Sequence, residues 1–235
     1  MAISKRSHRR EAVLPSAAEF DMEDIWPVFS DIAISLVFFL AFTLLAQFLE
    51  LSQVFDALER KRLQQTLWEK LRQDEFFQPS IRNGSITMTI QGSLQRFRFA
   101  ADIVFVAGES SLQPRGATVL TEFARFLSRE APPDLYIEVE GHTDRVPVVS
   151  GRYKDNWELS SQRALTVIRL FQSLDDDPSS GVRLNMDRIS AIGYGEFRPL
   201  EERKESAINR RVEIRLDYSG AAAGRRIEDA SPPIK

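Results

Sequence analysis

An apolar run at residues 32–49 constrains this 235-residue chain more than any other feature, because its 18 residues carry no charge. Extended to residues 25–49, the run contains one charged side chain, Asp31. A helix of that length measures about 37 Å, enough to cross a hydrocarbon layer of about 30 Å. Trp26 suits the membrane interface and Pro27 suits the first helical turn. The run therefore predicts one membrane-spanning helix over residues 25–49.

Two other interpretations of the run fit less well. A cleaved signal peptide would explain the basic residues between Lys5 and Arg10, but the apolar stretch is longer than a typical signal core. No small-residue cleavage site closes it before Glu50. A buried helix of a soluble domain would need a large surrounding core, which the polar flanks do not supply.

Composition excludes several classes of function. Lys and Arg total 31 against 34 Asp and Glu, so the surplus of positive charge that binds nucleic acid is missing. The absence of cysteine rules out disulfides, zinc–thiolate sites and cysteine nucleophiles. His8 and His142 are the two histidines of the chain, too few for a histidine-rich metal centre. We expect no metal, no cofactor and no direct contact with nucleic acid.

Asp31 is the unusual residue of the apolar run. A carboxylate in the middle of a bilayer costs about 2.5–3.5 kcal/mol, and ionisable groups there usually serve an ion pathway. Ser35 lies one turn further on the same helical face and is within reach of a hydrogen bond. Alternatively, Asp31 caps the start of the helix together with Ser30, close to the lipid headgroups. The residues alone favour an ion carrier and an N-cap equally.

The segment after the run continues a helical pattern. Leu51, Val54, Phe55 and Leu58 recur at helical spacing, and further leucines follow within residues 50–75. The spacing predicts an amphipathic helix that leaves the bilayer. Its apolar stripe pairs either with a second copy of itself or with the domain that follows.

Residues 81–218 alternate between strand and helix patterns, which predicts a compact α+β domain. The tail at 219–235 has no periodicity and is predicted to be disordered. Strands are expected at residues 85–90, 102–107, 135–140, 189–193 and 211–216, and helices at 115–129 and 160–174.

Four motifs occur in order within the predicted domain. They are Gly-His-Thr-Asp at 141–144, Asn-Trp-Glu-Leu-Ser at 156–160, Gly-Tyr-Gly-Glu at 193–196 and Asn-Arg-Arg at 209–211. Together they resemble the OmpA-like peptidoglycan-binding domain over about residues 98–217. The resemblance implies an α+β domain with a mixed sheet and helices on one face, after a single N-terminal transmembrane helix. It implies binding rather than an enzymatic reaction.

The resemblance also implies a ligand, the zwitterionic diaminopimelate in the peptide stem of the cell wall. Asp144 is implied to accept from its ammonium group, and Arg163 to hold its carboxylate with paired donors. Without the motifs, Asp144 would be interpreted as a cap and Arg163 as its ion-pair partner. The full set of implied peptidoglycan-binding residues is Thr143, Asp144, Asn156, Leu159, Arg163, Arg210 and Arg211.

The loop after Asp144 is longer than in many OmpA-like domains and is similar to the loop of the MotB branch. Trp26 and Asp31 also resemble the membrane signature of MotB-type stator subunits. This resemblance implies that Asp31, with Ser35 nearby, carries an ion, and that two copies of the chain sit inside five MotA-like A subunits. Basic residues flank the run equally, so the resemblance alone implies a cytoplasmic N-terminus and a periplasmic C-terminal domain in the bacterial inner membrane.

Within that group, the short layout and the spacing of Trp26 and Asp31 resemble the ZorB subunits of Zorya anti-phage defence. That resemblance implies indirect signalling to cytoplasmic defence effectors. A flagellar stator subunit, a passive membrane-to-wall tether and a hydrolase using His142 and Asp144 are the alternatives. The lone carboxylate with Ser35 favours H⁺ over Na⁺. The expected organisation is 1–24 cytoplasmic, 25–49 transmembrane, 50–80 amphipathic linker, 81–218 wall-binding domain and 219–235 tail.

Overall fold

The computed structural model describes residues 22–149 and 151–219. The chain divides into two compact units, Met1–Ser52 and Gln53–Lys235, and each is described by itself. The first helix, α1, runs over Met22–Gln73. Pro27 lies inside α1 rather than in its first turn. The expected disorder at 219–235 falls almost wholly outside the described residues.

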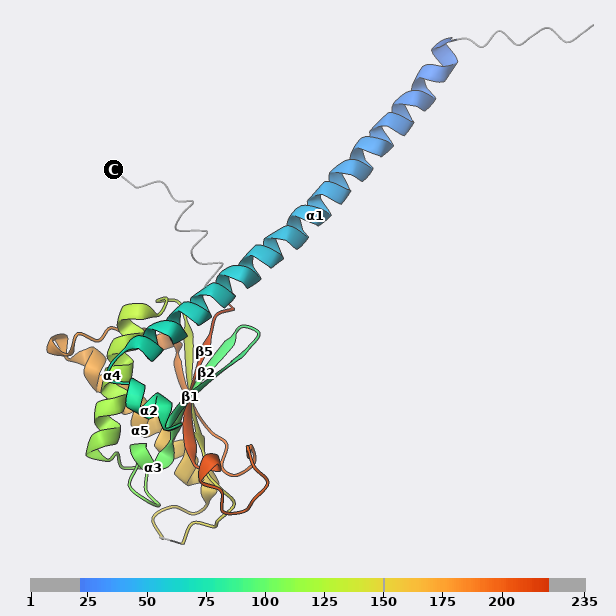
Figure 1. Cartoon of the computed structure of the whole chain (residues 1–235). Helices are drawn as coiled ribbons and strands as arrows, with labels where there is room; N and C mark the ends of the chain where they lie inside the picture. Colours follow the sequence, from blue (N-terminus) through green and yellow to red (C-terminus); the bar gives the residue numbers. More distant parts are fainter. Residues whose placement is uncertain (1–21, 150, 220–235) are drawn as a thin grey trace, which may run out of the picture. The chain divides into compact units, whose positions relative to one another are not determined.

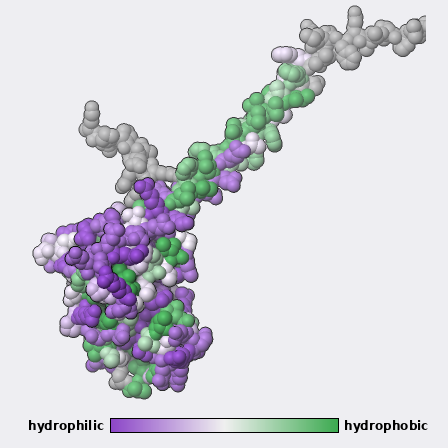
Figure 2. Space-filling view, in the orientation of Figure 1, coloured by the Kyte–Doolittle hydropathy of each residue, from purple (hydrophilic) through white to green (hydrophobic). Residues whose placement is uncertain are grey.

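The described part of the first unit is helical, and its large apolar side chains are exposed from Phe29 onward. The part of α1 from Phe29 onward is long and apolar enough to cross a membrane, judged by length and composition. Phe38 and Phe42 are 71% and 70% exposed. Figure 2 shows the apolar residues covering this helix. Such a surface is unfavourable in water and matches the hydrocarbon of a bilayer.

A five-stranded mixed sheet forms the centre of the second unit. The strand order is β1-β2-β5-β3-β4, with β3 and β4 parallel and all other neighbours antiparallel. The predicted strands near 85–90, 135–140, 189–193 and 211–216 are therefore confirmed. The bounds are Ile86–Gln91 for β1, Leu94–Ala100 for β2, Tyr136–His142 for β3, Ile189–Gly193 for β4 and Arg211–Asp217 for β5.

The helices cover one face of this sheet (Figure 1), as expected. Helix α4 buries Phe123 and Phe126 against the sheet, and Phe97 and Phe99 of β2 lie 5.1 and 5.0 Å from the ring of Phe123. These aromatic contacts make the centre of the core. The helical bounds are Gln78–Arg82 for α2, Ala101–Val104 for α3, Pro114–Glu130 for α4 and Asn156–Asp176 for α5; 3₁₀ turns occupy Pro178–Ser180, Met186–Arg188 and Ala207–Asn209.

The prediction of a strand at 102–107 is wrong. Residues up to Val104 form α3, and Phe105 makes an isolated bridge to Leu112. Val104 and Phe105 are both fully buried although they are neighbours, which a strand with one covered face cannot achieve. Strand β2 was missed, although its phenylalanines alternate with arginines in the period of two that marks a half-covered strand.

The two alternatives for the amphipathic stripe apply to different parts of α1. Leu67 and Leu71 are buried in the core of the second unit. The side chain of Gln64 donates to the Gly92 carbonyl at 3.2 Å, which fastens this stretch to the β1–β2 turn. Phe55 remains 58% exposed. The last turns of α1 therefore pack on their own domain. The part of the apolar stripe around Phe55 remains exposed, where a partner could contact it.

Candidate functional site

A cavity of about 470 Å³ opens where β3 ends and α5 begins. It gathers six of the seven side chains predicted for ligand binding, and Arg211 is the exception. The volume suits one amino-acid-sized ligand with its neighbours. The lining residues are Gly108, Thr143, Asp144, Val146, Pro147, Val148, Val149, Asn156, Leu159, Arg163, Glu205 and Arg210.

The start of α5 is fixed against the ends of β3 and β4, and two glycines make this close approach possible. A Cβ atom on Gly141 would lie 2.0 Å from the carbonyl oxygen of Ser160, and one on Gly193 would lie 2.2 Å from Oγ of Ser161. The Ser160 hydroxyl accepts a hydrogen bond of 2.9 Å from the Gly195 amide. The glycine motifs therefore serve to dock the helix that supplies the pocket.

Asp144 places a buried carboxylate in the pocket. The residue is 6% exposed, and its Oδ2 accepts from Nη1 of Arg210 at 2.7 Å. Its Oδ1 accepts a weaker bond of 3.3 Å from the Val146 amide. The Arg210 side chain is 41% exposed, so it approaches Asp144 from the rim. The ion-pair partner of Asp144 is thus Arg210, and the alternative pairing with Arg163 is wrong.

Asn156 holds the loop that follows Asp144. Its side-chain nitrogen donates to the backbone carbonyls of Asp144 at 3.2 Å and Val146 at 3.0 Å, and to Oε2 of Glu196 at 2.6 Å. Thr143 contributes a buried hydroxyl that has no hydrogen-bond partner in the described structure. A buried polar atom without a partner is unfavourable, which makes the Thr143 hydroxyl available to a ligand.

Arg163 is a buried cation with unused donors. The residue is 4% exposed, its Nε donates to the Glu109 carbonyl at 2.9 Å, and its guanidinium lies 5.2 Å from the ring of Phe105. Among residues 22–149 and 151–219 its terminal nitrogens make no hydrogen bond. Burial lowers the pKa of Arg163 to about 10, so the group remains a cation at neutral pH. Such a group is poised to bind an incoming carboxylate with two parallel bonds.

Arg211 lies outside the pocket, on the uncovered face of the sheet. Its Nε donates to Oε1 of Glu213 at 2.6 Å, and its terminal nitrogens donate to the carbonyls of Asn209 and Arg198. Burial raises the pKa of Glu213, but the hydrogen bond and charge of Arg211 outweigh burial and leave that pKa below its usual range. The contacts of Arg211 are therefore those of a structural ion pair.

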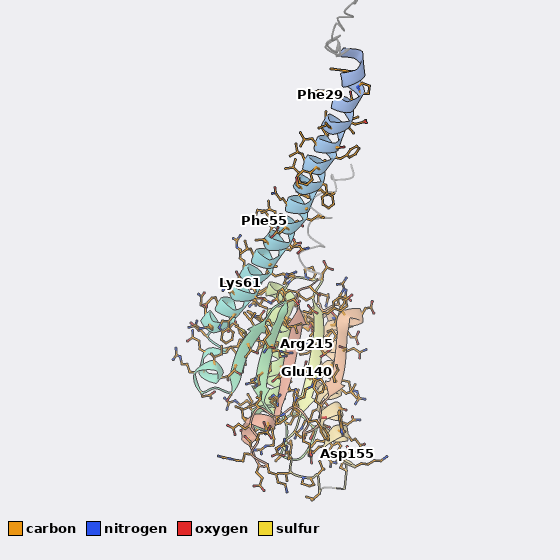
Figure 3. All side chains as sticks on the ribbon, turned by 90° about the vertical axis from the view of Figure 1, so that its right-hand side faces the viewer. Phe29, Phe55, Lys61, Glu140, Asp155 and Arg215 are labelled. Atoms are coloured by element: carbon orange, nitrogen blue, oxygen red, sulfur yellow. The ribbon has the colours of Figure 1, made fainter. Side chains whose placement is uncertain are left out.

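Glu140, His142 and Glu213 meet on this face with ligand-type atoms within 4.8 Å of one another. Figure 3 shows Glu140 near the middle of the sheet. Three such groups could hold a metal ion. However, Arg211 and Arg98 bond Glu213 at 2.6 and 3.1 Å and already supply the positive charge that a cation would bring. The cluster is neutralised from within the protein.

Further residues, not expected from the sequence, anchor the long loop after Asp144. The Tyr153 hydroxyl donates to Oγ of Ser110 at 2.9 Å, and Arg152 pairs with Glu109 at 2.9 Å. These contacts tie the loop to the segment whose carbonyl also orients Arg163. The length of the loop was the one signal available, because nothing in the sequence relates Tyr153 to residues 43 positions earlier.

Asp31 and Ser35 belong to the other unit. The described helix begins nine residues before Asp31, so Asp31 is not its N-cap. The hydroxyl of Ser30 donates to the Trp26 carbonyl within the helix at 2.9 Å. The side chains of Asp31 and Ser35 are exposed, one turn apart on α1. The helix start therefore removes the capping alternative.

Comparisons with known proteins agree with this architecture. Residues 104–213 match the model of the OmpA family. YtxE, an uncharacterised protein of Bacillus subtilis, is 37% identical over 120 residues, 50% of this chain and 46% of that protein. Motility protein B of Bacillus subtilis is 30% identical over 138 residues, 57% of this chain and 49% of that protein. The chain thus spans about half the length of these curated relatives.

Solved structures give the same result. A MotB-like protein from Desulfovibrio vulgaris has a TM-score of 0.55 and 27% identity, covering 67% of this chain and 98% of that chain. The cell wall anchor of the type VI secretion system of Pseudomonas aeruginosa shares the fold. Its TM-score is 0.51 and its identity 24%, and the match covers 63% of this chain and 96% of that chain. The protein thus combines one long apolar N-terminal helix with an OmpA-like α/β domain.

Proposed function

We propose that the pocket binds the peptide stem of peptidoglycan through a zwitterionic diaminopimelate residue. Asp144 receives the ammonium group and Arg163 clamps the carboxylate, while Thr143, Asn156 and Leu159 shape the cavity. The observation that carries this proposal is a buried anion and a buried cation with unused donors in one cavity. A ligand with both charges neutralises both groups, which a ligand with one charge cannot do.

Arg210 takes part by pairing with Asp144 in the empty pocket. The side chain is 41% exposed, so it is free to turn outward when an ammonium group takes its place. Exchange of one cation for another keeps Asp144 neutralised throughout binding. His142 does not line the cavity, which argues against a hydrolase built on His142 and Asp144.

Two matched peptides test this proposal on the full-length chain in detergent micelles. One is a stem tripeptide that ends in meso-diaminopimelate; the other ends in lysine and so lacks the distal carboxylate. Calorimetry should show tighter binding of the first by about tenfold or more, since charge-assisted bonds contribute about 1.5–3 kcal/mol. Arg163→Met should remove the preference, and Asp144→Asn should weaken both peptides.

Arg129→Met is the matched control, because that arginine side chain is 63% exposed on α4. It should bind both peptides as the unsubstituted chain does. Equal affinity of the unsubstituted chain for the two peptides would contradict the assignment of Arg163.

We further propose that the whole protein is the B subunit of an ion-driven, stator-like membrane complex, and that Asp31 carries the ion. Support comes from the apolar helix with a single acid and from the MotB-like fold of the attached domain. A neutral carboxylic acid tolerates an apolar interface, whereas a carboxylate does not, so protonation changes how the helix packs. Each charge that crosses 100 mV releases about 2.3 kcal/mol.

The partners follow from the same proposal. A MotA-like A subunit, five copies around two copies of this chain, would enclose the apolar helix. The homodimer would use the exposed stripe at Leu51 and Leu58 of α1. The protein would cross the bacterial inner membrane once, with a cytoplasmic N-terminus and the OmpA-like domain in the periplasm. Reporter fusions at either end test that orientation.

Proton uptake by membrane vesicles that hold the protein and its A subunit tests the ion-carrying role. Asp31→Asn should abolish uptake, Asp31→Glu should retain a part, and Ser35→Ala should reduce it. A passive tether would give no proton uptake even in the unsubstituted protein. That result, or uptake that Asp31→Asn leaves unchanged, would overturn the ion-carrying role of Asp31. Uptake driven by Na⁺ instead of H⁺ would correct the choice of ion.

For the biological setting we propose Zorya-type anti-phage defence. The supporting observation is the compact layout, in which α1 runs to Gln73 and β1 begins at Ile86. The similarity to motility protein B is the specific observation that favours a flagellar stator instead. Deletion of the gene should raise phage plaque counts and leave swimming intact. Lost swimming with unchanged plaque counts would favour the flagellar alternative.

A further inference from the structure

Two stacked aromatic rings lie beside the pocket and have no part in the site described above. The rings of Trp157 and Phe197 stack at 5.1 Å with an interplanar angle of 25°. Their residues are 47% and 63% exposed, so the surfaces not covered by stacking face solvent. Large aromatic side chains held in the open are typical of binding surfaces. We call this pair the aromatic platform.

The aromatic platform is continuous with the pocket. A second hollow of about 240 Å³ is lined by both rings and shares Pro147, Val148 and Asn156 with the first cavity. Asn156 precedes Trp157 in the chain, and its amide bonds Glu196, the neighbour of Phe197. The aromatic platform therefore adjoins the part of the pocket wall that these three residues form.

The contacts that build the pocket also hold the aromatic platform in place. Trp157 lies in the first turn of α5, where the Asp155 side chain accepts from the Glu158 amide at 2.8 Å and caps the helix. The Phe197 amide donates to the Tyr194 carbonyl at 3.2 Å in the turn that docks on α5. Neither ring needs a new backbone arrangement before it binds, so little conformational entropy is lost on binding.

The rim around the rings is polar. Arg145, Lys154, Asp155 and Glu196 line the same hollow, and they provide hydrogen-bond donors and acceptors of both charges. A flat apolar face inside a rim of donors and acceptors is complementary to a pyranose ring, which has apolar C–H faces and hydroxyl edges. A purely apolar partner would make no use of these donors and acceptors, whereas the hydroxyl groups of a sugar can bond them.

The chemistry of the proposed ligand places a sugar here. In peptidoglycan the stem peptide is joined through a lactyl group to a sugar of the glycan strand, and diaminopimelate is its third residue. The two intervening residues and the lactyl group span about 10 Å when extended. We infer that the aromatic platform is a glycan subsite, on which one pyranose ring stacks while the peptide occupies the pocket. This inference rests on the proposed function of the pocket.

Two probes with the same peptide test the inference on the full-length chain in detergent micelles. One is the stem tripeptide alone, and the other carries the N-acetylglucosaminyl–N-acetylmuramyl disaccharide. The unsubstituted chain should bind the disaccharide probe about tenfold more tightly. Trp157→Ala and Phe197→Ala should each remove most of that advantage and leave the affinity for the bare tripeptide unchanged.

Two further variants keep the result interpretable. Trp157→Phe should retain a large part of the advantage, because it keeps an aromatic face. Tyr136→Ala removes a residue that is 53% exposed at the start of β3, about 26 Å from the pocket end, and should change neither affinity. Urea unfolding of each variant shows whether it remains folded.

The outcomes separate the two proposals. Equal affinity of the unsubstituted chain for both probes refutes the glycan subsite and leaves the peptide pocket intact. Equal weakening of both probes by Trp157→Ala assigns the ring to the pocket wall and also refutes the subsite. Binding of neither probe refutes the function proposed for the pocket, and the subsite with it.

Discussion

Arg163 and Arg211 should respond oppositely to the same substitution, although they are 4% and 3% exposed. Arg211 bonds Glu213 at 2.6 Å, a separation worth about 6 kcal/mol of attraction at an effective dielectric constant of 20. Arg211→Met leaves Glu213 directly across the strands from Glu140, a second buried carboxylate. Loss of one partner from a buried pair typically costs about 3–5 kcal/mol. Because Arg98 still bonds Glu213 at 3.1 Å, we expect a loss at the lower end of that range.

Arg163→Met should instead leave the free energy of unfolding unchanged or raise it by up to about 2 kcal/mol. Burial lowers the pKa of Arg163 to about 10. This shift means that the charged side chain destabilises the folded state by at most about 3 kcal/mol. Removal of the cation relieves this cost. The lost hydrogen bond to Glu109, worth about 1 kcal/mol, offsets a part of it.

Urea unfolding of the full-length chain at pH 7, followed by tryptophan fluorescence, measures both stabilities. Calorimetry with the stem tripeptide measures affinity. We expect Arg163→Met to be stable and unable to discriminate the ligand carboxylate, and Arg211→Met to be unstable but able to bind while folded. A loss of 3 kcal/mol in Arg163→Met, or lost affinity without lost stability in Arg211→Met, would refute the separation of roles.

Three further predictions concern the framework of the site. Gly141→Ala should cost at least about 1–3 kcal/mol in unfolding free energy and weaken stem-peptide binding, because its methyl group would overlap the Ser160 carbonyl; near-normal urea unfolding would contradict this. Burial lowers the pKa of His142, so folding stability should hold above pH about 6.5 and fall below it by up to about 1.4 kcal/mol per pH unit. Urea midpoints between pH 5 and 8 should show this slope, and His142→Gln should flatten it. Asp155→Ala should cost about 0.5–2 kcal/mol through the lost cap of α5, measured by the same unfolding, whereas an unchanged midpoint would show that the cap is dispensable.

The sequence predicts the parts of the fold where a period repeats over several turns. Helix α4 was expected within a residue of its observed ends, because its phenylalanines recur at helical spacing. Strand β4 was expected with its observed bounds. Helix α3 was misread as a strand, because four residues are too few to show a period and packing on both sides hides the burial pattern.

Residues of the candidate site could be predicted where a motif determines both the residue type and the side of the sheet to which its side chain points. The adjacent arginines 210 and 211 show the limit. Arg210 precedes β5 and reaches Asp144, whereas Arg211 opens the strand and lies on the uncovered face of the sheet. Successive strand residues point to opposite faces, so the position of the strand start decides which arginine enters the pocket. The residue at which β5 starts depends on its pairing with β2 and β3. This long-range pairing cannot be recognised from the local sequence.

The position of β5 in the sheet determines when the domain can fold during synthesis. The strand formed last in the chain lies between β2 and β3 and bonds both of them. Until residues 211–217 leave the ribosome, the β1–β2 hairpin and the β3–β4 pair remain two separate fragments. The apolar helix, by contrast, emerges first. A growing chain therefore exposes its apolar helix long before the pocket-bearing domain is complete, and premature termination anywhere upstream of β5 yields that helix without a closed sheet.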